Sequence, residues 1–235
     1  MLNSLRLLAT ALAFVSLCAN AQDGGAAHQE FTPKSGHGRV VVIISGQSGM
    51  PAYTTTAQQI ADADFDVVLI DGNEFWIKDT RRAWDMLKDV ITHAQSGSHA
   101  LAGKVGVVGY SLGGASALSY AARMPDLVAT VVVSYPLTTF IKDPTDFVAR
   151  IKVPVQMFAG TADTYKNCCL IDMARQLANA AKASSPPMLT LREYNGVGHG
   201  FNLATAARKD QPAGQDAMQR TIAQLKQALP AQATQ

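Results

Sequence analysis

The sequence lacks the short motifs that mark several large classes of protein. It contains no H-E-x-x-H zinc signature, no G-x-G-x-x-G at the start of a helix and no G-x-x-x-x-G-K-[ST] phosphate loop. Internal repeats and low-complexity linkers are also absent. These absences argue against a zinc hydrolase of that type and against a nucleotide-binding protein, so we expect neither a metal ion nor an organic cofactor.

An excess of charge of one sign is missing as well. Lysine and arginine number 20 and aspartate and glutamate 18, which leaves a formal net charge of +2. A chain so nearly balanced has no electrostatic reason to bind nucleic acid or an anionic membrane. Its 48% hydrophobic composition excludes disorder, and its length suits a single α/β domain with a sizeable core.

The first residues do not have the character of a folded domain. One cation, Arg6, precedes an apolar run from Leu7 to Ala19, and the small residues Ala19-Asn20-Ala21 follow. This order is typical of an export signal, so we expect cleavage after Ala21, a mature domain of residues 22–235 and a periplasmic or secreted protein. The run is too short to span a bilayer comfortably, which argues against stable membrane insertion.

Cysteine is scarce, with three residues in the chain. A lipid anchor on Cys18 is one alternative to a cleaved signal, weakened by the bulky Leu17 before it, and a buried N-terminal helix is another. The remaining two, Cys168 and Cys169, are adjacent. Neighbouring Cα atoms lie about 3.8 Å apart, below the usual disulfide separation, and a bridge would close almost no loop. We therefore expect two buried, unbridged cysteines, with a vicinal disulfide as the alternative in an oxidising compartment.

Short apolar runs rich in β-branched residues alternate with longer stretches patterned for helices. The predicted strands are Arg39–Ile44, Asp66–Asp71, Lys104–Gly109, Ala129–Ser134, Val155–Gly160 and Leu189–Tyr194. The predicted helices are Thr55–Ala63, Thr80–Gln95, Leu112–Met124, Asp172–Ala183 and Ala213–Leu229. The stretch Gln22–Gly38 is expected to be loose, with at most a short edge strand. The alternation predicts a single α/β domain on a mostly parallel, doubly wound sheet flanked by helices.

The strongest motif is Gly109-Tyr110-Ser111-Leu112-Gly113-Gly114. It follows a predicted strand and opens a predicted helix, so this G-x-S-x-G arrangement sets the serine on a sharp turn with its hydroxyl above the sheet. The glycines are needed because side chains there would collide with neighbouring backbone. Ser111 is therefore the predicted nucleophile, and the helix N-terminus behind it favours a developing oxyanion.

Two further residues directly follow predicted strands, at the sheet edge where α/β proteins bind ligands. Asp163 comes after Val155–Gly160, and His199 lies on the glycine-rich loop after Leu189–Tyr194. Ser, then Asp, then His is the chain order of the triads on one large α/β fold. We expect His199 to act as the base and Asp163 to orient it. An ordinary loop histidine and a turn-capping aspartate are the alternatives. The competing acids, none of which directly follows a strand, are Asp143, Asp146 and Asp172.

An oxyanion hole needs two N–H donors. One should be the N–H of Leu112, the residue after the nucleophile. The second should follow the strand Arg39–Ile44, where Gln47 is the first choice and Ser48 the next, against the alternative of an ordinary turn. Residues that could line the pocket are Ser48, Tyr110, Asn73, Glu74 and Trp76. For the tryptophan, structural packing is the default interpretation.

Three of these loops together resemble the dienelactone hydrolase family of α/β-hydrolases. The GYSLGG turn around Ser111, the GTAD loop around Asp163 and the GVGHGF loop around His199 carry the resemblance, which runs from about Gly38 to the C-terminal helix. It implies a single-domain α/β-hydrolase fold without a large cap, no cofactor, and hydrolysis of ester or lactone bonds.

One residue departs from the family pattern. Dienelactone hydrolases proper use a cysteine nucleophile, whereas the matching position here is Ser111. The departure and the expected export argue against the dienelactone itself. They favour a serine hydrolase that cleaves a small carboxylic ester, lactone or thioester through an acyl-serine intermediate. The alternative is a binding protein that has kept the fold without catalysis.

Overall fold

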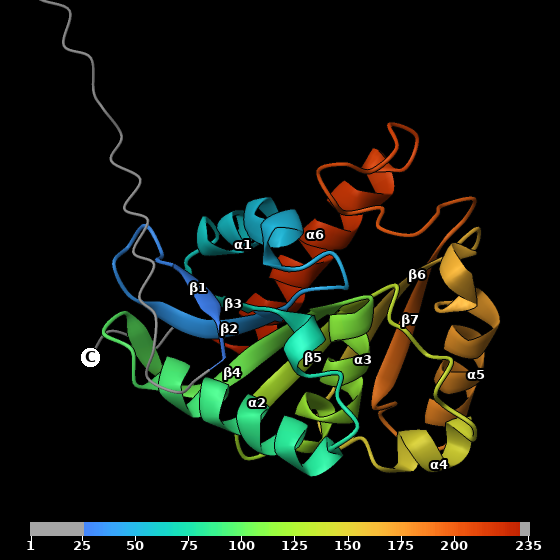
Figure 1. Cartoon of the computed structure of the whole chain (residues 1–235), viewed down its shortest axis with the longest axis horizontal. Helices are drawn as coiled ribbons and strands as arrows, with labels where there is room; N and C mark the ends of the chain where they lie inside the picture. Colours follow the sequence, from blue (N-terminus) through green and yellow to red (C-terminus); the bar gives the residue numbers. More distant parts are fainter. Residues whose placement is uncertain (1–25, 231–235) are drawn as a thin grey trace, which may run out of the picture.

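The computed structural model describes residues 26–230. The predicted export signal, its cleavage after Ala21 and the alternative anchor at Cys18 lie outside the described residues. The described chain forms one seven-stranded sheet with helices on both faces (Figure 1). None of its helices has the length and apolarity that crossing a bilayer would require.

The sheet has the order β1-β3-β2-β4-β5-β6-β7, with β1 antiparallel to β3 and every other pair parallel. The strands are β1 His28–Phe31, β2 Gly38–Ile44, β3 Phe65–Ile70, β4 Ala100–Tyr110, β5 Val128–Ser134, β6 Val155–Gly160 and β7 Leu189–Tyr194. The helices are α1 Thr54–Ala61, α2 Thr80–Gln95, α3 Leu112–Ser119, α4 Pro144–Ala149, α5 Ile171–Ala181 and α6 Gln211–Ala228. The predicted α/β fold is confirmed, and the short edge strand is β1.

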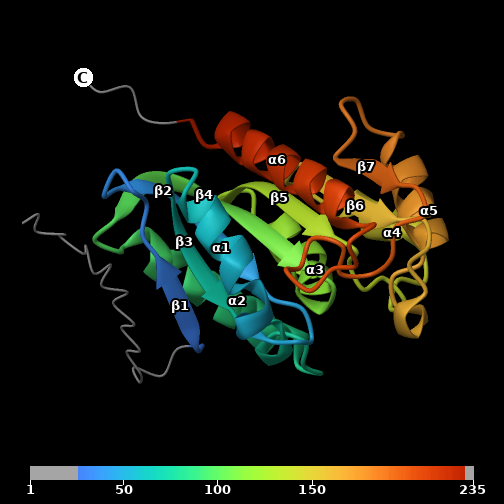
Figure 2. The ribbon, with the colours of Figure 1, turned by 90° about the horizontal axis from the view of Figure 1, so that it is seen from above.

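The sheet is buried on both faces, as its continuous apolar strands predict. Along β2, Val41 and Ile43 pack with α1 and α6, whereas Val40, Val42 and Ile44 pack with α2 and α3. Figures 1 and 2 show the two layers, with α1 and α6 on one side of the sheet and α2, α3 and α4 on the other. This double cover leaves the strand ends as the place where polar side chains can meet.

The predicted strand Lys104–Gly109 is longer than expected, since β4 begins at Ala100. Two other stretches differ more from the prediction. The predicted helix Leu112–Met124 is α-helical only to Ser119, because the backbone of Tyr120 (φ −119°, ψ −66°) breaks the helical series. The chain continues as the 3-10 turn Ala121–Arg123, in which N–H groups bond three residues back.

The second stretch is α4, which was not predicted because six residues are too few to show a helical period. Asp143 caps it, with Oδ1 accepting from the N–H groups of Thr145 at 2.8 Å and Asp146 at 3.0 Å. Asp146 in turn pairs with Arg150. Two of the competing acids thus serve this helix.

Candidate active site

Ser111 occupies the turn between β4 and α3 in a left-handed backbone conformation, with φ 50°. Its N–H donates to the carbonyl of Ser134 at 3.1 Å. A Cβ added to Gly109 would lie 2.6 Å from the carbonyl oxygen of Gly113 and 2.8 Å from Gly114 Cα, so no side chain fits there. The glycines of the motif therefore allow the sharp turn that aims the serine.

The structure brings the three residues predicted for catalysis together. His199 Nε2 lies 3.1 Å from Ser111 Oγ, and His199 Nδ1 lies 2.7 Å from Asp163 Oδ2. The Asp163 side chain is fully buried, and that of His199 is 18% exposed. An imidazole held between a hydroxyl and a buried carboxylate can accept the hydroxyl proton while the carboxylate stabilises the imidazolium.

The acid loop and the histidine loop are fixed to each other by backbone contacts. Ala162 N–H donates to the carbonyl of Val197 at 3.0 Å, and Thr161 N–H to that of Tyr194 at 2.9 Å. A Cβ on Gly160 would collide with the carbonyl of Val197. The spacing between Asp163 and His199 is thus set by main chain rather than by flexible side chains.

Two tyrosines enclose the imidazole of His199. The Tyr165 ring stacks on it with centroids 4.5 Å apart and 14° between the planes, and the buried Tyr135 ring meets it edge-on at 4.6 Å. Tyr135 also has positive φ (39°), its hydroxyl donates to Asn202 Oδ1 at 2.7 Å, and burial raises its pKa. Asn202 Nδ2 in turn donates to Ser134 Oγ at 3.1 Å. These contacts fix the orientation of the imidazole ring.

The predicted oxyanion donors lie on the two segments that border the nucleophile. Leu112 is the first residue of α3, where N–H groups have no partner within the helix. Gln47 lies in a turn closed by the N–H of Gly49 on the carbonyl of Gly46 at 3.0 Å. A Cβ on Gly46 would stand 3.2 Å from Ser111 Cβ, so this turn begins directly against the serine.

The Gln47 turn is tied down from two sides. Asn73 Nδ2 donates to the Gln47 carbonyl at 3.3 Å and to Asp71 Oδ1 at 2.8 Å. Lys166 Nζ donates to Gln47 Oε1 at 3.2 Å and links the turn to the acid loop across the site. Asn73, predicted as a pocket residue, therefore positions the backbone of the turn.

The other residues predicted for the pocket have different places. Tyr110 is buried and stacks on Tyr53, with centroids 4.9 Å apart, so it has no surface to offer a substrate. Trp76 packs edge-on against Phe140 at 5.0 Å and lines a separate cavity. Ser48 is exposed beside Gln47, and Glu74 is half-buried in the 3-10 turn Gly72–Glu74.

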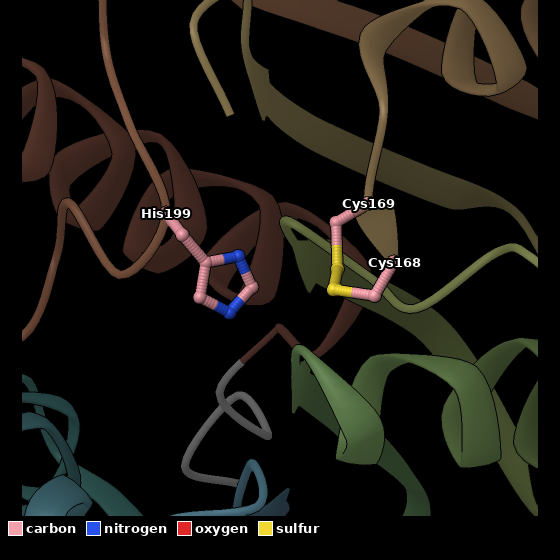
Figure 3. Close-up of side chains that lie close together, drawn as sticks. All are labelled: Cys168, Cys169 and His199. Atoms are coloured by element: carbon pink, nitrogen blue, oxygen red, sulfur yellow. A yellow bond between two sulfur atoms is a disulfide. The ribbon is translucent and has the colours of Figure 1, made fainter. Parts of the chain in front are cut away.

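Cys168 and Cys169 form a vicinal disulfide, so the expectation of unbridged cysteines is wrong. The expectation rested on two arguments: neighbouring Cα atoms lie closer than the usual disulfide separation, and the bridge closes almost no loop. The bond is nevertheless formed within one turn of the chain. Both cysteines are buried, and the Thr138 N–H donates to the Cys168 carbonyl at 2.9 Å. Figure 3 shows the bridge beside the imidazole of His199.

These three side chains are also the one group of metal-ligand types that gathers in the described part of the chain, with ligand atoms within 4.8 Å of one another. The sulfurs are bonded to each other, and both nitrogens of His199 already have partners. Cysteine binds a metal as the thiolate, so the oxidised pair offers no thiolate ligand.

Sequence reasoning missed Tyr135, Tyr165 and Asn202. A signal for the first was present, since Tyr135 directly follows β5 just as Asp163 closely follows β6. For Tyr165 the signal was its position two residues after Asp163, and Asn202 had none beyond its place on the histidine loop.

Comparisons with known proteins concern the family and the fold of the chain. The sequence model of the dienelactone hydrolase family matches residues 28–229. A carboxymethylenebutenolidase of Rhodococcus opacus is 27% identical over 213 residues, covering 80% of this chain and 81% of the relative.

Two of the solved structures that share the fold illustrate the likeness. A thermophilic esterase of Thermogutta terrifontis has TM-score 0.66 and 17% identity, with 88% and 90% of the two chains covered. A monoacylglycerol lipase of Paleococcus ferrophilus has TM-score 0.63 and 18% identity, with 84% and 98% covered.

Proposed function

The chain belongs to the dienelactone hydrolase family, and on that premise we propose that it hydrolyses a small carboxylic ester or lactone through an acyl intermediate on Ser111. Membership of this family makes it an ester-bond hydrolase. The proposal adds the nucleophile, the base His199 and the orienting acid Asp163. The observation that carries it is the hydrogen-bonded chain from Ser111 Oγ through the imidazole to Asp163 Oδ2.

The first half-reaction follows from these contacts. As Ser111 Oγ attacks the carbonyl carbon, its proton passes to His199 Nε2. Asp163 Oδ2 holds the proton on Nδ1 and stabilises the imidazolium. The carbonyl oxygen, now negative, is received by the N–H of Leu112 at the N-terminus of α3 and by the N–H of Gln47 on the turn after β2. The imidazolium then returns its proton to the leaving alkoxide, and the C–O bond breaks.

In the second half-reaction a water molecule takes the place of the alcohol. His199 accepts its proton while the hydroxide attacks the acyl carbon, and Ser111 leaves with the proton from Nε2. A lactone differs in that its leaving oxygen stays attached to the acyl group, so hydrolysis yields a single hydroxy acid.

The substrate is proposed to carry an apolar group. In the described part of the chain, the large hydrophobic side chains that remain exposed are Tyr165, at 43%, and Leu170, at 40%. They flank the Cys168–Cys169 bridge beside His199. Exposed apolar surface beside the proposed base could bind the acyl or alcohol part of an ester.

The test is covalent labelling. The purified protein is treated with a fluorophosphonate and its intact mass is measured, with Ser111→Ala and His199→Ala beside it. We expect one adduct on the parent, none on Ser111→Ala and strongly slowed labelling of His199→Ala. Folding of each variant is checked by circular dichroism. An unlabelled but folded parent would overturn the proposal and favour a binding protein that has kept the fold.

We also propose that residues 1–21 direct export and are removed after Ala21. The support is the order of cation, apolar run and small residues, and the Cys168–Cys169 bridge fits an oxidising compartment. Expression of the full chain in a bacterial host, followed by N-terminal sequencing of the periplasmic fraction, tests this. A mature protein that begins at Gln22 supports it, and an uncleaved cytoplasmic protein contradicts it.

A further inference from the structure

A cavity of about 960 Å³, the one that Trp76 lines, lies away from the candidate active site. It runs between α2 and α4 and reaches the end of α3 at Ser119 and Tyr120. Figure 1 shows α3 between these two helices, on the sheet face opposite α1 and α6. Ser111, Asp163 and His199 are not among its lining residues. Its volume is typical of sites that hold a small molecule.

Aromatic rings form much of the wall. Trp76 meets Phe140 edge-on at 5.0 Å, and Phe140 meets Phe147 at 5.8 Å. Trp84 lines the same cavity from α2, so both tryptophans of the chain lie here. A wall of half-buried ring edges and faces suits a flat apolar group.

The charge of the lining is positive. Five cationic side chains border the cavity, namely Lys78, Arg81, Arg123, Lys142 and Arg150, against the two carboxylates of Asp143 and Asp146. Both carboxylates are engaged, one with Arg150 and the other as the cap of α4. In the described part of the chain, Lys78, Arg123 and Lys142 have no carboxylate within ion-pair distance.

Arg123 is a half-buried cation of this lining with an incomplete set of hydrogen bonds. Its guanidinium lies over the Phe147 ring, 5.2 Å from the centroid, and its Nε is shielded from solvent with no hydrogen-bond partner among the described residues. Burial and the nearby Arg150 lower its pKa, and Asp146 acts more weakly in the opposite direction. Because Asp146 is paired with Arg150, a partly desolvated Arg123 has no ion pair of its own, and a bound carboxylate would offset that cost.

We propose that this cavity binds an aromatic carboxylate, with its flat body against Trp76 and Phe140 and its carboxylate on Arg123. The aromatic wall selects the body, and the excess of unpaired cations selects the anionic head. The site is separate from Ser111 and does not depend on the proposed hydrolysis.

Tryptophan fluorescence tests the proposal, because both tryptophans of the chain line the cavity. The protein is titrated with 3-phenylpropionate, excited at the red edge of tryptophan absorption. The neutral isostere 3-phenylpropanamide is titrated in parallel, and so is the aliphatic dodecanoate. We expect a saturable change with the aromatic carboxylate and affinity at least about tenfold weaker for the amide, since charge-assisted hydrogen bonds are lost.

The decisive variant is Arg123→Gln, which should weaken 3-phenylpropionate binding by about tenfold or more. Arg192→Gln is the matched control, because that guanidinium also lies over an aromatic ring, 5.7 Å from the Tyr194 centroid, but outside the cavity. It should bind as the parent does. Arg123→Lys, which keeps the charge, guards against a folding defect and should retain part of the affinity.

Several results would overturn the proposal. These are no saturable change in the parent, equal affinity for the amide, equal affinity of folded Arg123→Gln, or binding of dodecanoate alone.

Discussion

The phenol ring of Tyr165 stacks on the imidazole of His199, 4.5 Å away and nearly parallel. The backbone N–H of the same tyrosine donates to Asp163 Oδ1 at 3.0 Å. One residue therefore contacts both the proposed base and the carboxylate that orients it. The next two residues, Lys166 and Asn167, have φ of 48° and 53°, a left-handed conformation that non-glycine residues adopt at a cost. Such strain persists only where the surroundings hold it.

Replacing Tyr165 by alanine should lower kcat/KM for a p-nitrophenyl ester. A stacked aromatic pair is worth about 0.5–1.5 kcal/mol, so we expect a loss of roughly twofold to tenfold if that energy positions the imidazole. Tyr165→Phe keeps the ring and should stay close to the parent. Equal losses in both variants would assign the effect to the hydroxyl instead, and steady-state kinetics on the three proteins separates the cases.

Reduction of the Cys168–Cys169 bridge should lower activity with little change in thermal stability. The bond joins neighbours and closes almost no loop, so its entropic contribution to unfolding is small. Its effect should be local, because it follows directly on the segment that carries Tyr165. Turnover and the melting temperature are measured with and without a dithiol reductant.

The control for this prediction is the double variant Cys168→Ser with Cys169→Ser. It should start at the reduced level of activity and be insensitive to reductant. Equal turnover of the oxidised and reduced parent would show that the segment holds its conformation without the bond.

The fold and the catalytic candidates were predictable because each rests on a local pattern. Buried parallel strands need continuous β-branched runs, as in β2 and β5, and those runs stand out in the sequence. Ser111 sits in a motif whose glycines are required by backbone contact. Asp163 and His199 follow strands closely, where topology alone brings distant segments together.

The remaining features depend on contacts between segments far apart in sequence. The stacking of Tyr165 on His199 and the hydrogen bond from Lys166 to Gln47 each join separate loops. No period or motif encodes such pairs. The helix α4 was too short to leave a pattern, and Trp76 follows a strand end yet turns toward Phe140. The rule that residues near strand ends line the site thus holds for some of them and not for others.

Stability should fall as the pH rises above about 10. Burial raises the pKa of Tyr53 from 10.0 to about 12 and also raises those of Tyr110 and Tyr135. Above pH 10 the unfolded chain loses these protons while the folded protein keeps them, so the folded state is disfavoured. The slope is up to about 1.4 kcal/mol per pH unit for each tyrosine.

Tyr110→Phe tests that prediction with little side effect, because the Tyr110 hydroxyl has no hydrogen-bond partner among the described residues. Urea unfolding at about pH 9 and about pH 11 should show a smaller difference for this variant than for the parent. The same loss in both proteins would place the pH dependence in other groups.

Asp163→Asn should reduce kcat by about a thousandfold or more, the size of effect expected when a neutral amide replaces the acid of a triad. The amide cannot stabilise the imidazolium, and its single oxygen must accept from both the Tyr165 N–H and His199 Nδ1, which the two carboxylate oxygens serve now.

The matched controls are Asp143→Asn and Asp172→Asn, two of the other acids that the sequence offered. Asp143 caps α4, so its loss should cost about 1 kcal/mol of stability and leave kcat nearly unchanged. Asp172 pairs with Arg175 on the surface and should change neither. If Asp163→Asn stayed within tenfold of the parent, the buried carboxylate would serve to shape the loop rather than to support the base.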